Sequence, residues 1–76
     1  MKRNKSMEYF QNFESSNIYK IGYESSSSTL EVEFQNRRVY QYFDVPEHIW
    51  EQFKTAESKG QFLHYNIKGN YRYSRV

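Results

Sequence analysis

The chain has 76 residues, no cysteine, 20% aromatic residues and a formal net charge of +2. This length predicts one small domain that buries only about 60% of its unfolded surface. Without cysteine, neither disulfides nor thiolate metal sites can support the core. No apolar run approaches the length of about 18 residues that a membrane helix needs, and the N-terminus lacks a secretory signal. We therefore expect a cytoplasmic protein without a membrane partner.

The first 14 residues, MKRNKSMEYFQNFE, show neither the alternation of a strand nor the capping residues of a helix. We predict an N-terminal extension over residues 1–14, and we favour a flexible extension over a partly ordered one. The folded domain is predicted to cover residues 15–76.

Three strands are predicted at the start of the domain. Residues 18–23 are rich in β-branched and aromatic types, and the polar stretch ESSSST after them is typical of a hairpin loop. The segment LEVEF within residues 29–35 alternates apolar and polar side chains, which indicates a strand with one buried face. The returning strand covers residues 38–43.

The pairing of the last two strands decides which way Tyr40 and Tyr42 point. In one register Val32 lies opposite Gln41, and both tyrosines lie on the polar face. A shift of one residue places Val32 opposite Tyr40 or Tyr42, and the tyrosines then join the apolar face. The second register keeps the Gln41 amide outside the core, where burial without a partner would cost about 1–3 kcal/mol. We therefore predict that both tyrosines belong to the core.

A first helix is predicted over residues 46–56. A proline in the first turn and an acidic residue before it are N-terminal signals, and they place the cap at Asp44 or Val45. The apolar residues of this helix recur at helical spacing and predict one buried face: Ile49, Trp50, Phe53 and Ala56.

A second helix is predicted over residues 59–68. Ser58 and Gln61 fit a capping box, and Gly69 is suited to the position after the helix. Four residues are expected to form its apolar surface: Phe62, Leu63, Tyr65 and Ile67. The fold class is therefore α+β, a three-stranded antiparallel β-meander followed by two short α-helices. The C-terminal aromatic and basic segment NYRYSRV either closes over the core or adds to the sheet.

Several stretches together resemble the KTSC domain, a short bacterial module found alone or at the C-terminus of some lysyl-tRNA synthetases. The matching stretches are SSNIYKIGYE, LEVEF, VYQYFDVP and AESKGQFLHYNIKGNYRY. The family often carries a glycine in the turn before Tyr-x-Tyr, which suits a three-residue loop with a bulge. Here the turn contains Asn36 and Arg37, so one of them is expected in a left-handed conformation, which asparagine tolerates better. The synthetase context of the family suggests RNA binding.

Side chains suited to catalysis are scattered along the chain. His48 and His64 are single histidines without a partner at metal-ligand spacing, and we interpret them as surface residues. Asp44 is interpreted as a helix cap, and Glu31 and Glu33 as a solvated strand face. We therefore expect no enzyme activity, no catalytic residue, no metal site and no cofactor.

The charge distribution points to the C-terminal part of the chain. Seven of the nine acidic residues lie between Glu24 and Glu57, whereas residues 58–76 contain four basic residues and no acidic one. Basic side chains interleaved with tyrosines are typical of proteins that bind single-stranded nucleic acids. The candidate nucleic-acid-binding residues are Arg37, Arg38, Lys59, Lys68, Tyr71, Arg72, Tyr73 and Arg75.

We thus predict a non-catalytic accessory module that binds RNA or single-stranded DNA through a basic C-terminal face. Packing of Tyr71 and Tyr73 against the body is the structural alternative for these residues. The functional alternative is a small protein-interaction module, or an inhibitor that binds a larger enzyme. The sequence leaves the oligomeric state open.

Overall fold

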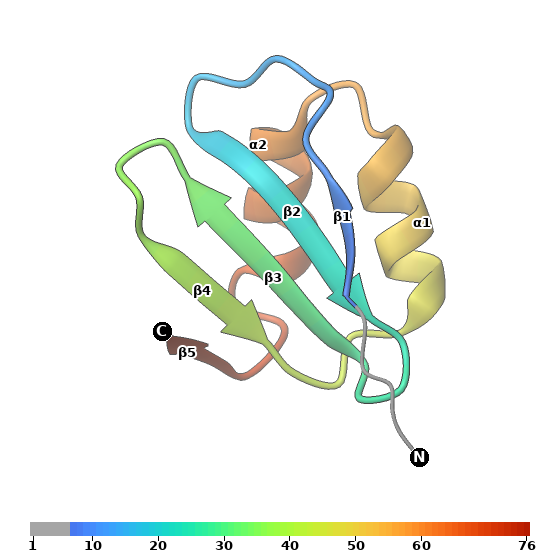
Figure 1. Cartoon of the computed structure of the whole chain (residues 1–76). Helices are drawn as coiled ribbons and strands as arrows, with labels where there is room; N and C mark the ends of the chain where they lie inside the picture. Colours follow the sequence, from blue (N-terminus) through green and yellow to red (C-terminus); the bar gives the residue numbers. More distant parts are fainter. Residues whose placement is uncertain (1–6) are drawn as a thin grey trace.

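The computed structural model describes residues 7–76, which form a five-stranded antiparallel sheet in the order β1-β2-β3-β4-β5. The strands are β1 Glu8–Phe10, β2 Ile18–Glu24, β3 Thr29–Phe34, β4 Val39–Tyr42 and β5 Tyr73–Arg75. The helices are α1 Glu47–Thr55, α2 Lys59–Phe62 and the π-helical turn η1 Leu63–Ile67. They cover one face of the sheet (Figure 1). The α+β class is confirmed.

The sheet is larger than the predicted three-stranded meander, which forms its centre as β2, β3 and β4. One strand of three residues is added at each edge, β1 beside β2 and β5 beside β4. The prediction was wrong on the size of the sheet because strands this short carry too little alternation to be recognised. Of the two roles considered for the C-terminal segment, adding to the sheet is the one observed.

The predicted N-terminal extension contains β1 in its described part, while residues 1–6 lie outside the described residues. The Glu8 carboxylate accepts hydrogen bonds from Trp50 Nε1 and Lys54 Nζ on α1, each at 3.1 Å. Phe10 packs against the core. These contacts attach β1 to the helical layer as well as to β2.

The β3–β4 hairpin adopts the register that places both tyrosines on the core side. Val32 pairs with Tyr40, and Leu30 pairs with Tyr42. Gln41 lies on the opposite face, where its amide nitrogen donates to Glu31 Oε1 at 3.0 Å. The predicted register is therefore confirmed, and Tyr42 belongs to the core as expected, whereas Tyr40 is half-buried and packs against the core.

The loop of this hairpin has three residues and a single left-handed position. The Arg37 N–H donates to Phe34 O at 2.9 Å, and the Phe34 N–H donates to Arg38 O at 2.8 Å. Arg37 has a φ of 74°, so it is the residue that takes the conformation usually adopted by glycine. Asn36 instead accepts a hydrogen bond from the Arg38 N–H.

The predicted cap of α1 at Asp44 or Val45 was wrong. The helix begins at Glu47 with Pro46 as its N-cap residue and without a side-chain cap. Asp44 has a φ of 58°, which is incompatible with capping the helix. Val45 is buried. Its N–H donates a hydrogen bond to Ser28 O, and its carbonyl accepts one from the Tyr23 hydroxyl. Both backbone groups of Val45 are thus hydrogen-bonded to the β2–β3 hairpin, through its turn and through a side chain of β2.

The second helical segment begins at Lys59 as predicted, ends at Ile67, one residue earlier than predicted, and changes type in the middle. The Ser58 hydroxyl accepts from the Gln61 N–H at 3.2 Å, and Gly69 follows the segment with a φ of 83°. After α2 the chain widens into η1, which buries Leu63 and Ile67 and leaves Tyr65 73% exposed. Tyr65 was expected on the apolar surface, and that expectation was wrong because the wider turn directs it outward.

The core lies between the sheet and the helices and consists of Ile18, Ile21, Tyr23, Leu30, Val32, Tyr42, Val45, Trp50, Phe53, Leu63 and Ile67. Tyr23 stacks on Trp50 with ring centroids 5.6 Å apart. Large rings thus supply much of the buried area, as expected for a short aromatic-rich chain. Within the described residues, no helix has the length and apolar character required to span a bilayer.

Candidate functional site

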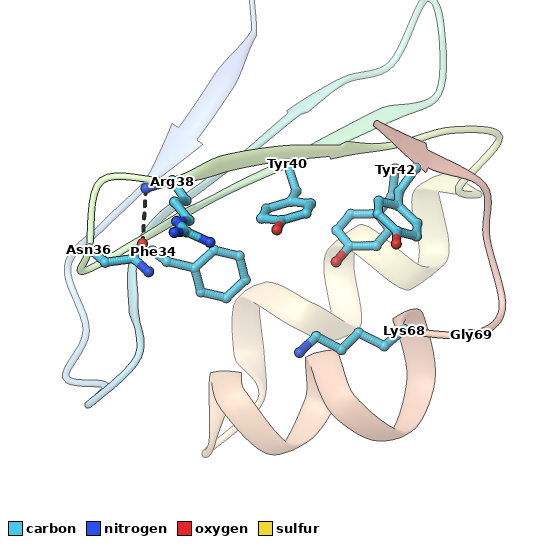
Figure 2. Close-up of a pocket in the computed structure, with 8 residues that line it drawn as sticks. Phe34, Asn36, Arg38, Tyr40, Tyr42, Lys68 and Gly69 are labelled. Carbon is cyan, nitrogen blue, oxygen red and sulfur yellow. Dashed lines mark hydrogen bonds between the residues drawn. The ribbon is translucent and has the colours of Figure 1, made fainter. Parts of the chain in front are cut away.

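A groove of about 490 Å³ lies between the helix-facing side of β3–β5 and the segment that follows η1 (Figure 2). We call it the aromatic groove. Its lining residues are Phe34, Asn36, Arg38, Tyr40, Tyr42, Lys68, Gly69 and Tyr73. The groove therefore has aromatic, cationic and amide side chains in its lining and no acidic one.

Four rings form a continuous row in this groove. Phe34 contacts Tyr40 edge to face at a centroid distance of 5.7 Å. Tyr73 lies 5.8 Å from Tyr40 and 5.7 Å from Tyr42. The row exists because β5 pairs with β4 and brings Tyr73 directly opposite Tyr42. Aromatic faces of this kind can stack on planar groups of a ligand.

The two cations of the groove come from different layers. Arg38 extends from the β3–β4 hairpin, and Lys68 extends from the end of η1 on the helical side (Figure 2). Both are exposed, and neither forms an ion pair within residues 7–76. Their charges are therefore available to an anionic ligand, whose phosphate groups would accept hydrogen bonds from both side chains.

The buried end of the row is electrically neutral. Burial raises the pKa of the Tyr42 hydroxyl, and the neighbouring hydroxyls of Tyr40 and Tyr73 raise it further. The neutral form of this phenol is thus favoured, and the floor of the groove adds no negative charge that would oppose an anion.

Four of the predicted binding residues lie at the groove or beside it. Arg38, Lys68 and Tyr73 line it directly. Arg75 pairs with Tyr40 in the sheet, so its side chain starts from the same face at the β5 edge. Residues far apart in the sequence are therefore brought to one surface.

Two other predicted arginines are directed elsewhere. Arg37 lines a separate depression with Tyr19, Lys20 and Glu33. Arg72 is paired with Asp44 at 3.1 Å, and its guanidinium lies over the Phe43 ring at 5.4 Å. Neither arginine contributes to the lining of the aromatic groove.

Lys59 is buried and Tyr71 packs against the core, so neither lines the aromatic groove. Lys59 is only 6% exposed, and its ammonium donates to Ala56 O at 2.6 Å beneath the rings of Phe10 and Phe13. Burial lowers the pKa of this lysine. Tyr71 is half-buried and packs against the core. We therefore leave both residues out of the candidate site.

Sequence reasoning did not assign Phe34, Tyr40 or Tyr42 to a binding site. Tyr40 and Tyr42 were interpreted as core residues, and Tyr42 is indeed 3% exposed, yet both also line the groove. The hairpin register could have indicated this shared face. The groove itself could not be inferred, because it depends on β5 and on the position of Lys68.

The described part of the chain contains no candidate metal site. Among residues 7–76, no three histidine, aspartate or glutamate side chains gather in a way that could hold a metal ion. His48 and His64 are both exposed. The aromatic groove is thus the surface with the clearest ligand chemistry.

The fold and the groove define a small α+β domain with an aromatic and cationic surface. The family model of the KTSC domain matches residues 14–71. The chain belongs to the KTSC domain family, and the resemblance seen in its sequence is confirmed. The KTSC domain is a small domain that is not a known catalytic domain.

Relatives occur both within larger enzymes and as short chains. A lysine–tRNA ligase of Trichormus variabilis is 43% identical over 63 residues, which are 83% of this chain but only 11% of the ligase. A protein of Tsukamurella paurometabola is 32% identical over 62 residues, 82% of this chain and 92% of that protein. The chain thus spans about a tenth of the ligases that it matches.

The crystal structure of a KTSC domain protein from Yersinia pestis has the same fold. It superposes with a TM-score of 0.87 and 35% sequence identity, and the match covers 93% of this chain and 99% of that chain. The whole architecture is therefore shared, including more of the chain than the family model matches.

Proposed function

We propose that this domain is a non-catalytic accessory module that binds RNA or single-stranded nucleic acid in the aromatic groove. The observation that carries the proposal is the lining of the groove, in which Arg38 and Lys68 flank a row of rings without any acidic side chain. The cations can contact phosphates, and the exposed ring of Tyr73 can stack on a base.

The relatives support the same proposal from an independent direction. The lysine–tRNA ligases that carry a matching segment are named for a tRNA substrate. A small domain attached to such an enzyme can add affinity for the RNA without taking part in catalysis.

The proposal is tested by fluorescence anisotropy with labelled single-stranded RNA, single-stranded DNA and duplex DNA. We expect single strands to bind, and their affinity to fall steeply between about 50 and 200 mM salt. The double variant Arg38→Ala with Lys68→Ala is expected to lose about two phosphate contacts. Each contact contributes about −0.7 to the slope of the logarithm of the binding constant against the logarithm of the salt concentration.

The matched control is the double variant Arg37→Ala with Arg72→Ala. It removes the same number of positive charges, but from side chains outside the groove. Binding that is retained in the control and lost in the groove variant supports the proposal. Equal loss in both variants, or no binding of single strands at low salt, contradicts it.

A protein-interaction module is the second candidate, and one observation favours it. All three residues of β5 are exposed, and β5 is an edge strand. Edge strands offer unpaired backbone groups to an extended peptide. Recovery of one protein partner from nuclease-treated lysate, together with no nucleic-acid binding, would favour this candidate.

A further inference from the structure

Two further depressions adjoin the aromatic groove. Each of them shares Phe34 and Lys68 with the groove. One continues along α2 and η1 and is lined by Ser16, Asn17, Phe34, Ser58, Gly60, Gln61, Leu63, His64, Tyr65 and Lys68. The other is lined by Ser16, Asn17, Phe34, Gln35, Asn36 and Lys68. No acidic side chain lines either depression, so the surface keeps the charge character of the groove throughout.

The far end of this surface carries a second aromatic platform. Tyr65 is 73% exposed, and the ring of His64 supports it edge to face at a centroid distance of 4.8 Å. The π-helical turn directs Tyr65 outward while Leu63 and Ile67 face the core. An exposed ring that contributes nothing to the core is available to a ligand, and π-helical turns often occur at functional sites.

The chemistry alternates along the surface. Rings line the groove, Lys68 lines the groove and both depressions, and Tyr65 lines the depression along η1 but not the groove. Ser16, Asn17 and Gln61, which carry hydroxyl and amide groups, line the same depression as Phe34 and Tyr65. A single-stranded nucleic acid presents the same alternation, because its bases stack and hydrogen-bond while its phosphates require cations.

We propose that a single strand of several nucleotides runs from the aromatic groove across Lys68 to Tyr65, which stacks on a base at the far end. This inference rests on the proposed function and extends its site. Two platforms separated by a cation suit an extended strand better than a mononucleotide. A duplex is expected to bind more weakly, because its bases are stacked on one another and cannot reach the rings.

The test compares oligouridylates of increasing length, from the dinucleotide to the octanucleotide, by fluorescence anisotropy. We expect affinity to rise with length until the strand reaches Tyr65. Tyr65→Ala is expected to weaken the octanucleotide about tenfold and to leave the dinucleotide unchanged. Tyr65→Phe keeps the ring and is expected to retain the octanucleotide affinity.

Tyr19→Ala is the matched control. Tyr19 is also an exposed tyrosine, 47% exposed, but it lines the separate depression that contains Glu33 and not the proposed binding surface. Circular dichroism checks that each variant is folded, and a duplex octamer of mixed sequence is expected to bind more weakly than the single strand.

Three results would overturn the inference while the proposed function stands. They are an affinity independent of length, equal losses for Tyr65→Ala and Tyr19→Ala, and a duplex bound as tightly as the single strand. If no oligonucleotide of any length binds, the proposed function fails and the inference fails with it.

Discussion

Tyr42 on β4 and Tyr73 on β5 lie directly opposite one another, with ring centroids 5.7 Å apart. Tyr42 is 3% exposed and belongs to the core, whereas Tyr73 is 62% exposed. One row of rings thus passes from the interior to the surface. The core holds the inner ring in place, and the inner ring supports the outer one in the groove.

The two tyrosines should respond differently to truncation. Tyr42→Ala removes a buried ring and is expected to cost about 3–5 kcal/mol, a large share of the stability of a small domain. Tyr73→Ala is expected to cost below about 1 kcal/mol and to weaken oligonucleotide binding. Urea unfolding and anisotropy measure the two effects. Unfolding of the domain by Tyr73→Ala would contradict the assignment of this ring to the binding surface.

Gly22 should be sensitive to the addition of a single carbon. A Cβ at this position would lie 2.8 Å from the ring of Tyr9, which crosses Gly22 from the paired strand β1. Gly22→Ala is therefore expected to displace that ring and to destabilise the domain by about 1 kcal/mol. In a double-mutant cycle by urea unfolding, Tyr9→Ala should suppress the effect of Gly22→Ala. Additive losses would show that the contact is not the cause.

Replacing Arg37 with glycine should stabilise the domain. Its φ of 74° is strained for a residue with a Cβ, so Arg37→Gly is expected to stabilise the hairpin by about 1 kcal/mol. Asn36→Gly is the control, because Asn36 lacks a positive φ and its side chain accepts from the Arg38 N–H. Thermal unfolding should therefore shift in opposite directions for the two variants. A lower unfolding temperature for Arg37→Gly would contradict this account of the turn.

Glu8 should make the free energy of unfolding depend on pH. The hydrogen bond from Trp50 lowers the pKa of Glu8, and Lys54 lowers it further. Because the folded-state pKa lies below the unfolded value of about 4.3, the stabilisation is complete above that pH. It is lost as the pH falls through the lowered folded-state pKa.

The prediction for Glu8 is measured as the difference in unfolding free energy between the wild type and Glu8→Gln. We expect the wild type to be more stable near neutral pH, by less than about 1 kcal/mol for a pair this exposed, and the difference to shrink as the pH falls below the unfolded pKa of about 4.3. Glu57→Gln, at an exposed helix-flanking position, is the control. A difference that is constant with pH would contradict the role of the Glu8 carboxylate.

Local patterns in the sequence were sufficient to predict the central part of the fold. The alternation in LEVEF and the position of Gln41 predicted the β3–β4 register, because one face of the hairpin must avoid burying polar groups. Ser58 and Gly69 marked the ends of the second helical segment, because each meets a local backbone requirement. Such signals depend on neighbours in the chain, so they can be read without the tertiary structure.

The tertiary structure alone decided the edges of the sheet and the composition of the groove. The three-residue strands pair with β2 and β4, which residues distant in the chain supply. The rings of Phe10 and Phe13 lie over the buried Lys59 ammonium. Arg38, Lys68 and Tyr73 meet in one groove although they are far apart in the chain. The sequence by itself determined the class of fold and the family, whereas long-range packing determined which cations and rings share a surface.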